Sequence, residues 1–295
     1  MKEDLRMMNN VCLEGALAEA CRQLRRDLRR VRTNVRLMKK YSQHFMRSCR
    51  IGYAFVRELK KLSPQIIFEL GAGAGFLTRF LATLGKPVIA VEVDPRVASI
   101  LSTNVEDLLH VHPLLGDGIH FLESRCTRAD VLASNTPYSL TGPVLIAYIR
   151  SNIRSAVLML QQEVAKRLTS APGSKEYGRV TVMVNYFNVV KVSTTFKPKD
   201  FIPSPKVSSQ LVVLKRIREW KPEHALFETL LRCMFSQRRR LAKNVLRKCL
   251  RSISPHIDEE AIIGILRERN LENSRVYELG VDIYSAIYEA LKRYS

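Results

Sequence analysis

The sequence predicts an α/β fold in which a mostly parallel sheet with an antiparallel edge precedes a small C-terminal all-α domain. Short apolar runs alternate with helical stretches of about 10–20 residues through the first part of the chain. Runs that are apolar on both faces are typical of parallel strands covered by helices on each side. After Trp220 only amphipathic helical patterns remain. The predicted parallel strands are QIIFEL (65–70), PVIAVEVD (87–94), VHPLLGD (111–117), DVLASN (130–135) and SAVLMLQ (155–161).

Further elements on either side of these strands complete the predicted order. Residues 12–40 predict a basic helix, and residues 50–62 predict a second helix. The later runs VTVMVNYF (180–187) and SSQLVVLKR (208–216) are joined by a Pro-rich segment, which suits an added antiparallel pair at the sheet edge. We therefore expect a basic N-terminal helical extension, a sheet-containing domain and a helical domain, with bounds of 1–38, 39–217 and 218–295.

Composition and charge indicate a globular protein with a polyanionic partner. The 295 residues include 48 Lys and Arg against 28 Asp and Glu, which gives a formal net charge of +20. Thirteen of the basic residues lie in 1–50 with five acids, and twelve lie in 215–251 with three acids. This concentration in two segments predicts nucleic-acid binding. The alternative is that both segments are solvated helix faces.

Several other classes of protein are disfavoured. The six cysteines and six histidines are scattered without CxxC or zinc-ligand spacing, so we expect neither a metal site nor a secreted disulfide framework. No run of about 18 apolar residues predicts a membrane span, and because the N-terminus lacks the apolar core of a secretory signal, we expect none. The Arg-rich run CRQLRRDLRRVRTNVR superficially resembles an organellar transit peptide, but Glu14, Glu19 and Asp27 argue against one. We expect a cytoplasmic protein with no membrane partner.

The strongest local signal is a glycine-rich loop in FELGAGAGFLTRFLA (68–82). Gly71, Gly73 and Gly75 lie between a predicted strand and a predicted helix, where a tight turn and close approach to a ligand require glycine. No Gly-Lys-Ser/Thr follows, so a Walker A loop and nucleoside triphosphate hydrolysis are disfavoured. The spacing is GxGxG, unlike the GxGxxG of dinucleotide binders. Alone, the loop is a weak signal.

Two acidic residues at neighbouring strand ends strengthen the prediction of a ligand site at the glycine loop. Glu92 ends the next strand about 20 residues on, where a carboxylate can accept hydrogen bonds from both ribose hydroxyls. Asp117 follows the third strand at the same sheet edge, where ligands of open α/β sheets bind. The alternative for each acid is helix capping or solvent exposure. Together they predict a nucleoside site, for which NAD and S-adenosylmethionine both remain open.

The fourth strand ends in NTPY, and this segment favours methyl transfer to an exocyclic amine. Such an amine is a poor nucleophile because its lone pair is delocalised into the ring. Acceptors on the Asn135 side chain and the Thr136 backbone carbonyl would favour a pyramidal nitrogen. Pro137 would fix that backbone, and Tyr138 would offer a face for an unstacked base. Positioning and dipoles carry this effect without a general base. An ordinary Asn-x-Pro turn is the alternative.

At this point the sequence resembles the S-adenosylmethionine-dependent rRNA adenine dimethyltransferase family (the KsgA/Dim group), from about Lys39 to Leu250. Eight motifs in the family's order are more specific than any one of them. They are KKYSQHFM, ELGAGAGFLT, VEVD, GD at 116–117, NTPY, QQEVAKRL (161–168), FIPSPKVSS and FSQRRRLAKNVL. The resemblance implies a Rossmann-like class I methyltransferase sheet, with S-adenosyl-L-methionine as methyl donor and no metal.

The resemblance also implies roles for residues at matching positions. Cofactor contacts are expected from His44, Met46, Gly71, Gly73, Glu92, Asp117 and Asn135, and catalytic roles from Asn135, Pro137 and Tyr138. RNA contacts are expected from Arg238, Arg239, Arg240, Lys243 and Arg247. Ser42 and His44 stand where the family usually has Gly and Asn, so contacts in that segment are open. Thr136 replaces Leu or Ile, a change that a backbone role tolerates.

The implied reaction is dimethylation of the 6-amino groups of two adjacent adenosines near the 3′ end of small-subunit rRNA. The expected partner is that rRNA or the pre-ribosomal small subunit. We expect the protein to be a monomer. One alternative is an antibiotic-resistance relative that acts on large-subunit rRNA, and another is a non-catalytic ribosome-assembly or transcription factor on the same fold. The basic N-terminal helix lies outside the resemblance, and we hypothesise that it is an extra RNA-binding arm.

Overall fold

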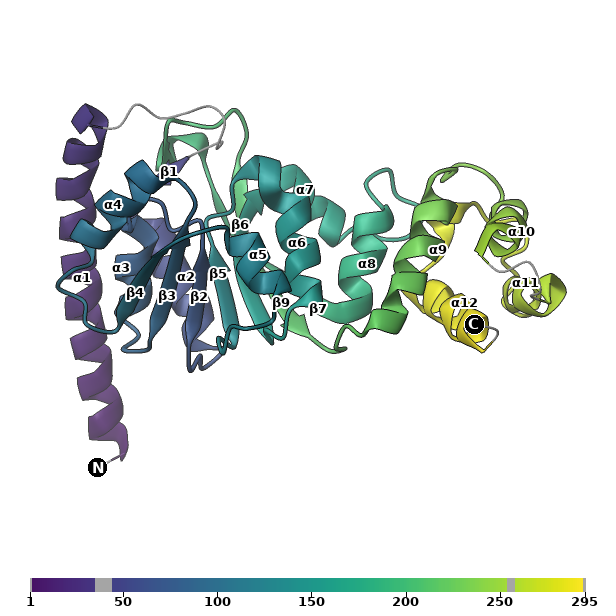
Figure 1. Ribbon diagram of the computed structural model, residues 1–295, viewed down its shortest axis with the longest axis horizontal. Helices are drawn as coiled ribbons and strands as arrows, with labels where there is room; N and C mark the ends of the chain where they lie inside the picture. Colours follow the sequence, from purple (N-terminus) through teal and green to yellow (C-terminus); the bar gives the residue numbers. More distant parts are fainter. Residues whose placement is uncertain (1, 35–43, 254–257, 294–295) are drawn as a thin grey trace. The chain divides into compact units, whose positions relative to one another are not determined.

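The computed structural model describes residues 2–34, 44–253 and 258–293 (Figure 1). The chain forms two compact units. Unit 1 consists of Met1–Ala165 and Lys191–Lys215, and unit 2 consists of Lys166–Val190 and Arg216–Ser295. Residues 166–190, which the sequence analysis assigned to the sheet-containing domain, thus group with the C-terminal helices. The basic N-terminal segment groups with the sheet.

The sheet of unit 1 has seven strands in the order β4-β3-β2-β5-β6-β9-β7. The five strands from β4 to β6 are parallel, as predicted, and β9 runs antiparallel to β6. Their bounds are β2 (Ile67–Leu70), β3 (Val88–Glu92), β4 (Val111–Leu115), β5 (Val131–Ser134), β6 (Ser155–Gln161), β7 (Asn188–Phe196) and β9 (Ser209–Arg216). Because the chain builds outward from β2 in one direction and then restarts at β5, the strand order reverses between them. Ligands of open α/β sheets bind at such a point.

Helices cover the central strands of the sheet because these strands are buried on both faces. All four residues of β2 and all four of β5 are buried, although each strand's side chains alternate between faces. The helices of this unit are α1 (Lys2–Asn34), α2 (Cys49–Lys60), α3 (Phe76–Ala82), α4 (Pro95–Asn104), α5 (Gly118–Glu123) and α6 (Thr141–Arg150). A separate short pair joins β1 (Phe45–Met46) to β8 (Phe201–Ile202). This pair brings two sequence-distant motifs together beside the sheet.

The N-terminal helix is attached to unit 1 by packing and by a disulfide. Ala20, Cys21 and Leu24 are buried in the same core as residues of α2 and α3, and α1 contacts both helices. Cys21 is bonded to Cys49, with a Cα–Cα distance of 5.5 Å. A second disulfide joins Cys233 to Cys249 in unit 2. The sequence predicted neither of these two disulfides. Partners 28 and 16 residues apart meet through helix packing, which cysteine spacing does not reveal.

The predicted strand over residues 180–187 was also wrong, because this segment is helix α8 (Arg179–Phe187). Its β-branched residues favour a strand, but Val182, Val184 and Phe187 are all fully buried. A helix that is apolar all round is stable where it is surrounded by other elements. Here α8 contacts α9 and α12. Only the following residues, from Asn188 onward, form edge strand β7.

Unit 2 is helical, as the sequence after Trp220 predicts. Besides α8 it contains α9 (Ala225–Phe235), α10 (Ala242–Ile253), α11 (Glu259–Glu268) and α12 (Val281–Lys292), and α7 (Gln162–Leu168) leads into it. Phe227, Leu246, Tyr284 and Tyr288 are fully buried and form part of its core. No helix among the described residues is both long enough and apolar enough to cross a membrane.

Candidate cofactor and adenine pocket

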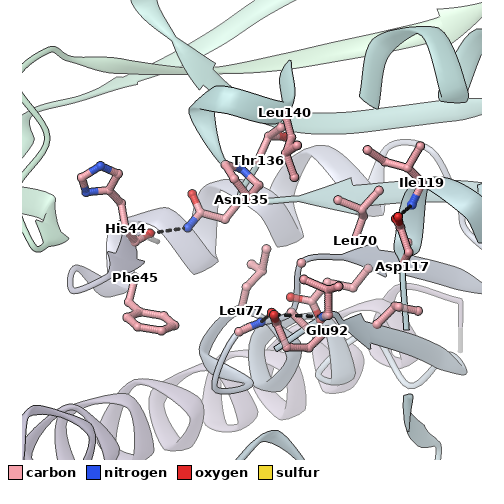
Figure 2. A pocket seen from close by; sticks show the side chains of 18 of the residues that line it. His44, Phe45, Leu70, Leu77, Glu92, Asp117, Ile119, Asn135, Thr136 and Leu140 are labelled. Carbon is pink, nitrogen blue, oxygen red and sulfur yellow. Dashed lines mark hydrogen bonds between the residues drawn. The ribbon is translucent and has the colours of Figure 1, made fainter. Parts of the chain in front are cut away.

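A cavity of about 280 Å³ opens at the carboxyl ends of β2, β3 and β5, at the point where the strand order reverses (Figure 2). Its walls come from the ends of consecutive strands, so residues far apart in the sequence converge there. All the pocket residues predicted from the sequence line it, namely His44, Met46, Gly71, Gly73, Glu92, Asp117, Asn135, Pro137 and Tyr138. Apolar walls are added by residues such as Phe45, Leu70, Phe76 and Ile119.

The glycine loop forms the floor of this cavity. Gly71, Gly73 and Gly75 have φ angles of 69°, 59° and 83°, a region that residues with a Cβ atom rarely adopt. A Cβ atom at Gly73 would lie 2.8 Å from the Phe45 ring. The amides of Gly71 and Ala72 both donate to the Val91 carbonyl, which holds the loop against β3. The loop therefore brings bare backbone to the pocket surface.

Glu92 connects the same loop to the next strand. Its carboxylate accepts hydrogen bonds from the backbone N–H groups of Gly73 (2.8 Å), Val93 (3.0 Å) and Asp94 (2.9 Å). The side chain is buried, and this burial raises the pKa of Glu92, although the three backbone hydrogen bonds oppose the shift. Glu92 thus presents a carboxylate whose position is fixed before any ligand binds.

Asp117 caps a helix, as its alternative interpretation predicted, and also lines the cavity. Its Oδ1 accepts a hydrogen bond from the Ile119 amide at 2.9 Å and caps α5 (Figure 2). The residue is exposed and still lines the cavity. Because one oxygen caps the helix, the other is left to face a ligand.

Asn135 is held by the segment that contains His44. Its Nδ2 donates to the His44 carbonyl at 2.8 Å (Figure 2). Since a carbonyl oxygen only accepts hydrogen bonds, the amide nitrogen must face His44, and Oδ1 faces away from it. Pro137, two residues after Asn135, has a φ of −57°, and its ring lies against Gly71. The Asn135 Oδ1 and the Thr136 carbonyl accept no hydrogen bond from the described backbone or side chains.

Tyr138 and His44 form a second wall of the cavity. The Tyr138 hydroxyl lies 2.6 Å from Ser209 Oγ on β9, and burial raises the pKa of Tyr138. His44 Nδ1 lies 2.7 Å from the carbonyl of Pro203 and therefore donates to it. The two ring centroids are 5.2 Å apart. Ser209 and Pro203 both belong to FIPSPKVSS, so the structure joins this motif to NTPY and to the His44 segment.

Glu69 was not among the predicted site residues. It lines the cavity from the end of β2 and is 1% exposed. Burial raises the pKa of Glu69 to about 8, against an opposing contribution from Thr78, and the charge of nearby Glu92 adds to the rise. The signal for it was its place at the strand end in ELGAGAG, directly before the glycine loop.

The predicted RNA contacts lie in unit 2 and differ in their surroundings. Arg238 donates to the carbonyls of Ser174 and Lys175 and lies over the Tyr277 ring, so its side chain is engaged within the unit. Arg247 pairs with Glu260 at 2.7 Å and with Glu259 at 3.5 Å. By contrast, Arg239 and Arg240 are exposed, Lys243 is half-buried, and none of the three is ion-paired with a described residue. The initial part of the predicted segment KKYSQHFM, including Ser42, lies outside the described residues.

Most of the chain is similar in sequence to a known protein family. The profile of the family described as ribosomal RNA adenine dimethylase matches residues 34–287. A protein of Thermotoga neapolitana named ribosomal RNA small subunit methyltransferase A is 35% identical over 259 residues, which cover 88% of this chain and 94% of that protein. The matched region is wider than the Lys39–Leu250 resemblance and leaves most of α1 outside it.

Solved structures agree. A dimethyladenosine transferase from Plasmodium falciparum superposes with a TM-score of 0.65 and 25% identity, covering 83% of this chain and 96% of that one. The 23S rRNA methyltransferase ErmE superposes with a TM-score of 0.62 and 21% identity, over 84% of this chain and 99% of that one, which shows a shared fold. The predicted arrangement of a mostly parallel sheet with an antiparallel edge is thereby confirmed.

Proposed function

The chain belongs to the ribosomal RNA adenine dimethylase family, and we propose that it dimethylates the 6-amino groups of two adjacent adenosines near the 3′ end of small-subunit rRNA. It is an enzyme, an S-adenosylmethionine-dependent rRNA adenine methyltransferase. The observation that carries the assignment to this site is the Asn135–His44 hydrogen bond, because it directs the Asn135 Oδ1 away from His44 and leaves it free to accept.

The cavity residues fit S-adenosylmethionine. The glycine loop brings the bare backbone of Gly71 and Gly73 to the cavity surface, and the carboxylates of Glu92 and Asp117 suit hydroxyl and amino donors. Apolar side chains such as Leu70 and Ile119 suit the faces of an adenine ring. His44, Met46, Gly71, Gly73, Glu92, Asp117 and Asn135 would hold the cofactor. When bound, it supplies an electrophilic methyl group.

The protein's own contribution to the reaction is to position the target amine. In the first transfer, Asn135 Oδ1 and the Thr136 carbonyl accept hydrogen bonds from its two N–H groups, which favours a pyramidal nitrogen with an available lone pair. The methylated nitrogen then releases one proton to solvent, and in the second transfer its one remaining N–H is held by one of the same two acceptors. Pro137 fixes the direction of the Thr136 carbonyl. Tyr138, anchored by Ser209, supplies a face on which an unstacked base can lie. A loop adenine reaches such a pocket at modest cost because it is not paired in a duplex.

RNA binding by unit 2 is part of the proposal. The exposed Arg239 and Arg240, together with Lys243, are suited to phosphate contact, since none is paired with a described acid. We assign Arg238 a supporting role, because its guanidinium is engaged with the carbonyls of Ser174 and Lys175. The substrate is the rRNA of the small subunit or its precursor particle. A cytoplasmic location and a monomeric state remain predictions.

Transfer of tritiated methyl groups to ribosomal particles that lack these methylations tests the proposal. We expect label on small subunits and its recovery as dimethyladenosine after RNA hydrolysis. Label on large-subunit RNA would instead support the resistance-type alternative. A complete absence of label on both subunits, with retained RNA binding, would support the non-catalytic alternative.

A further inference from the structure

We propose that the arginine-bearing face of α1, defined by Arg22, Arg25 and Arg26, is a second contact surface for the phosphodiester backbone of the substrate RNA. The proposal rests on the proposed function and extends it to a segment that lies outside the matched family region. It concerns only binding, because no α1 residue whose side chain the structure describes, within 12–28, lines the cofactor pocket.

The packing of α1 determines which of its faces is exposed. Ala20, Cys21 and Leu24 are buried against α2 and α3, and Leu17 and Leu28 pack against the same core. Arg22, Arg25 and Arg26 lie on the opposite side and are exposed. Positions 22, 25 and 26 follow the i, i+3, i+4 spacing of one helix face, and the sequence continues it with an arginine at 29. The helix therefore presents a basic stripe to solvent.

Among the described residues, the acids cancel only part of the charge on this face. Glu19 pairs with both Arg22 and Arg26, so one carboxylate is shared between two guanidinium groups. These side chains are still 64% and 55% exposed, and Arg25 makes no ion pair with a described residue. Exposed pairs of this kind contribute little stability, so a phosphate can replace the carboxylate at low cost. Arginine also matches phosphate oxygens with paired N–H donors.

The buried apolar face also discriminates between polyanions. A helix that binds a membrane surface inserts an exposed apolar face among the lipids. The apolar face of α1 is instead occupied by the core of unit 1, since Leu24 is only 1% exposed and Ala20 5%. Over residues 17–28 of α1 the apolar side is therefore covered and the charged side is exposed, which suits a phosphodiester backbone better than a bilayer.

The surface is tethered close to the reaction site. The Cys21–Cys49 disulfide joins α1 to the first residue of α2, and Met46 of the cofactor pocket lies three residues before that point. In Figure 1 the later turns of α1 lie at the end of unit 1 where β1 is drawn, and β1 contributes to the pocket wall. RNA held in the pocket can therefore reach this helix.

The test compares the full-length triple variant R22Q/R25Q/R26Q with a control, K86Q/R125Q/R128Q, that removes the same charge. The control residues precede β3 and β5 and so lie at the opposite sheet edge from the pocket. Affinity for a small-subunit rRNA transcript is measured over a series of KCl concentrations. We expect the α1 variant to bind at least about tenfold more weakly at 0.1 M salt, with a log–log salt slope about 2–3 smaller. The control should keep the wild-type slope.

Further readouts keep the inference separate from the proposed function. Methyl transfer by the α1 variant should show an increased KM for RNA and an unchanged kcat. The variant R22K/R25K/R26K should restore most of the salt slope. Equal slopes for the glutamine variant and its control, with wild-type methyl transfer intact, would overturn the inference and leave the function standing. Loss of binding to vesicles of anionic phospholipid, with RNA binding unchanged, would also overturn it.

Discussion

Asn135 has a single amide orientation because the group that it contacts can only accept a hydrogen bond. The His44 carbonyl receives Nδ2 at 2.8 Å, so the oxygen of the same amide faces the other way. The residue before Pro137, Thr136, adds a second free acceptor from the backbone. At the scale of single residues, the site is a pair of oriented oxygens.

Replacement of Asn135 by Ala removes one of these acceptors. We expect kcat to fall by about 10²–10³ or more, the range for loss of one oriented hydrogen-bonding group in an active site. RNA affinity should stay within about twofold, since the proposed phosphate contacts lie on other residues. Single-turnover methyl transfer and filter binding of rRNA measure the two effects. Activity near the wild-type level in this variant would contradict the amine-positioning role.

Glu69 makes stability depend on pH in a direction opposite to that of most acids. Its pKa is raised to about 8 by burial, so the folded protein keeps the proton where the unfolded chain has released it. The stabilisation is fully present below the ordinary pKa of 4.5 and is lost as pH rises through about 8. The slope is at most about 1.4 kcal/mol per pH unit.

We therefore expect Glu69→Gln to flatten the fall in unfolding free energy between pH 5 and 8, as measured by urea denaturation. Glu58 provides a control of opposite sign. Although burial would raise its pKa, hydrogen bonds from Lys61 and Ser193 lower it, so Glu58→Gln should lose most stability at neutral pH and less in acid. Parallel pH profiles for Glu69→Gln and the wild type would contradict the assignment.

At the scale of elements, the backbone conformation of the glycine loop determines which residues can occupy it. Gly73 combines a φ of 59° with the Phe45 ring in the place of a side chain. An alanine there must adopt a left-handed conformation and displace part of β1. The glycine loop therefore packs directly against the β1–β8 pair, and a change in one affects the other.

The variant Gly73→Ala should cost about 1–2 kcal/mol from the backbone alone and more from the contact with Phe45. Cofactor affinity, measured by isothermal titration calorimetry, should fall at least about tenfold. Gly142→Ala is the matched control, because a Cβ atom at Gly142 in α6 meets no atom within 4 Å. Similar losses of stability and cofactor affinity in both variants would contradict a specific role of the loop geometry in cofactor binding.

At the scale of the whole molecule, each unit contains its own disulfide. Cys21–Cys49 closes 28 residues in unit 1, and Cys233–Cys249 closes 16 residues in unit 2. Disulfides persist mainly in oxidising compartments, although intracellular proteins of hyperthermophiles also contain them. The two disulfides therefore favour an oxidising compartment, or the interior of a hyperthermophile, over an ordinary reducing cytoplasm. The predicted cytoplasmic location stays a prediction.

Reduction should destabilise both units. Loop-closure entropy predicts a loss of about 3–4 kcal/mol for each bond, so we expect the melting temperature to fall by several degrees in dithiothreitol. Cys21→Ser should reproduce the loss in unit 1 and Cys233→Ser the loss in unit 2, as followed by hydrogen exchange. A melting temperature that is the same in oxidant and reductant, with both thiol pairs shown to change state, would contradict this expectation.

The sequence by itself determined the parallel sheet, the helical C-terminal part and most of the residues around the pocket, though not Glu69. These follow from local rules: apolar runs set the strands, and strands of a parallel sheet end at one edge, which gathers Gly71, Glu92 and Asn135. Only the tertiary structure decided that residues 179–187 are a helix, since burial among other helices outweighs the strand preference of β-branched residues.

Contacts between distant segments were likewise beyond the sequence. The Asn135–His44 and Tyr138–Ser209 hydrogen bonds and both disulfides join residues from 16 to 91 positions apart. Residue spacing does not encode such meetings, because they depend on how helices and strands pack. The sequence therefore indicated most of the groups that line the cavity, and the packing decided the direction in which each group points.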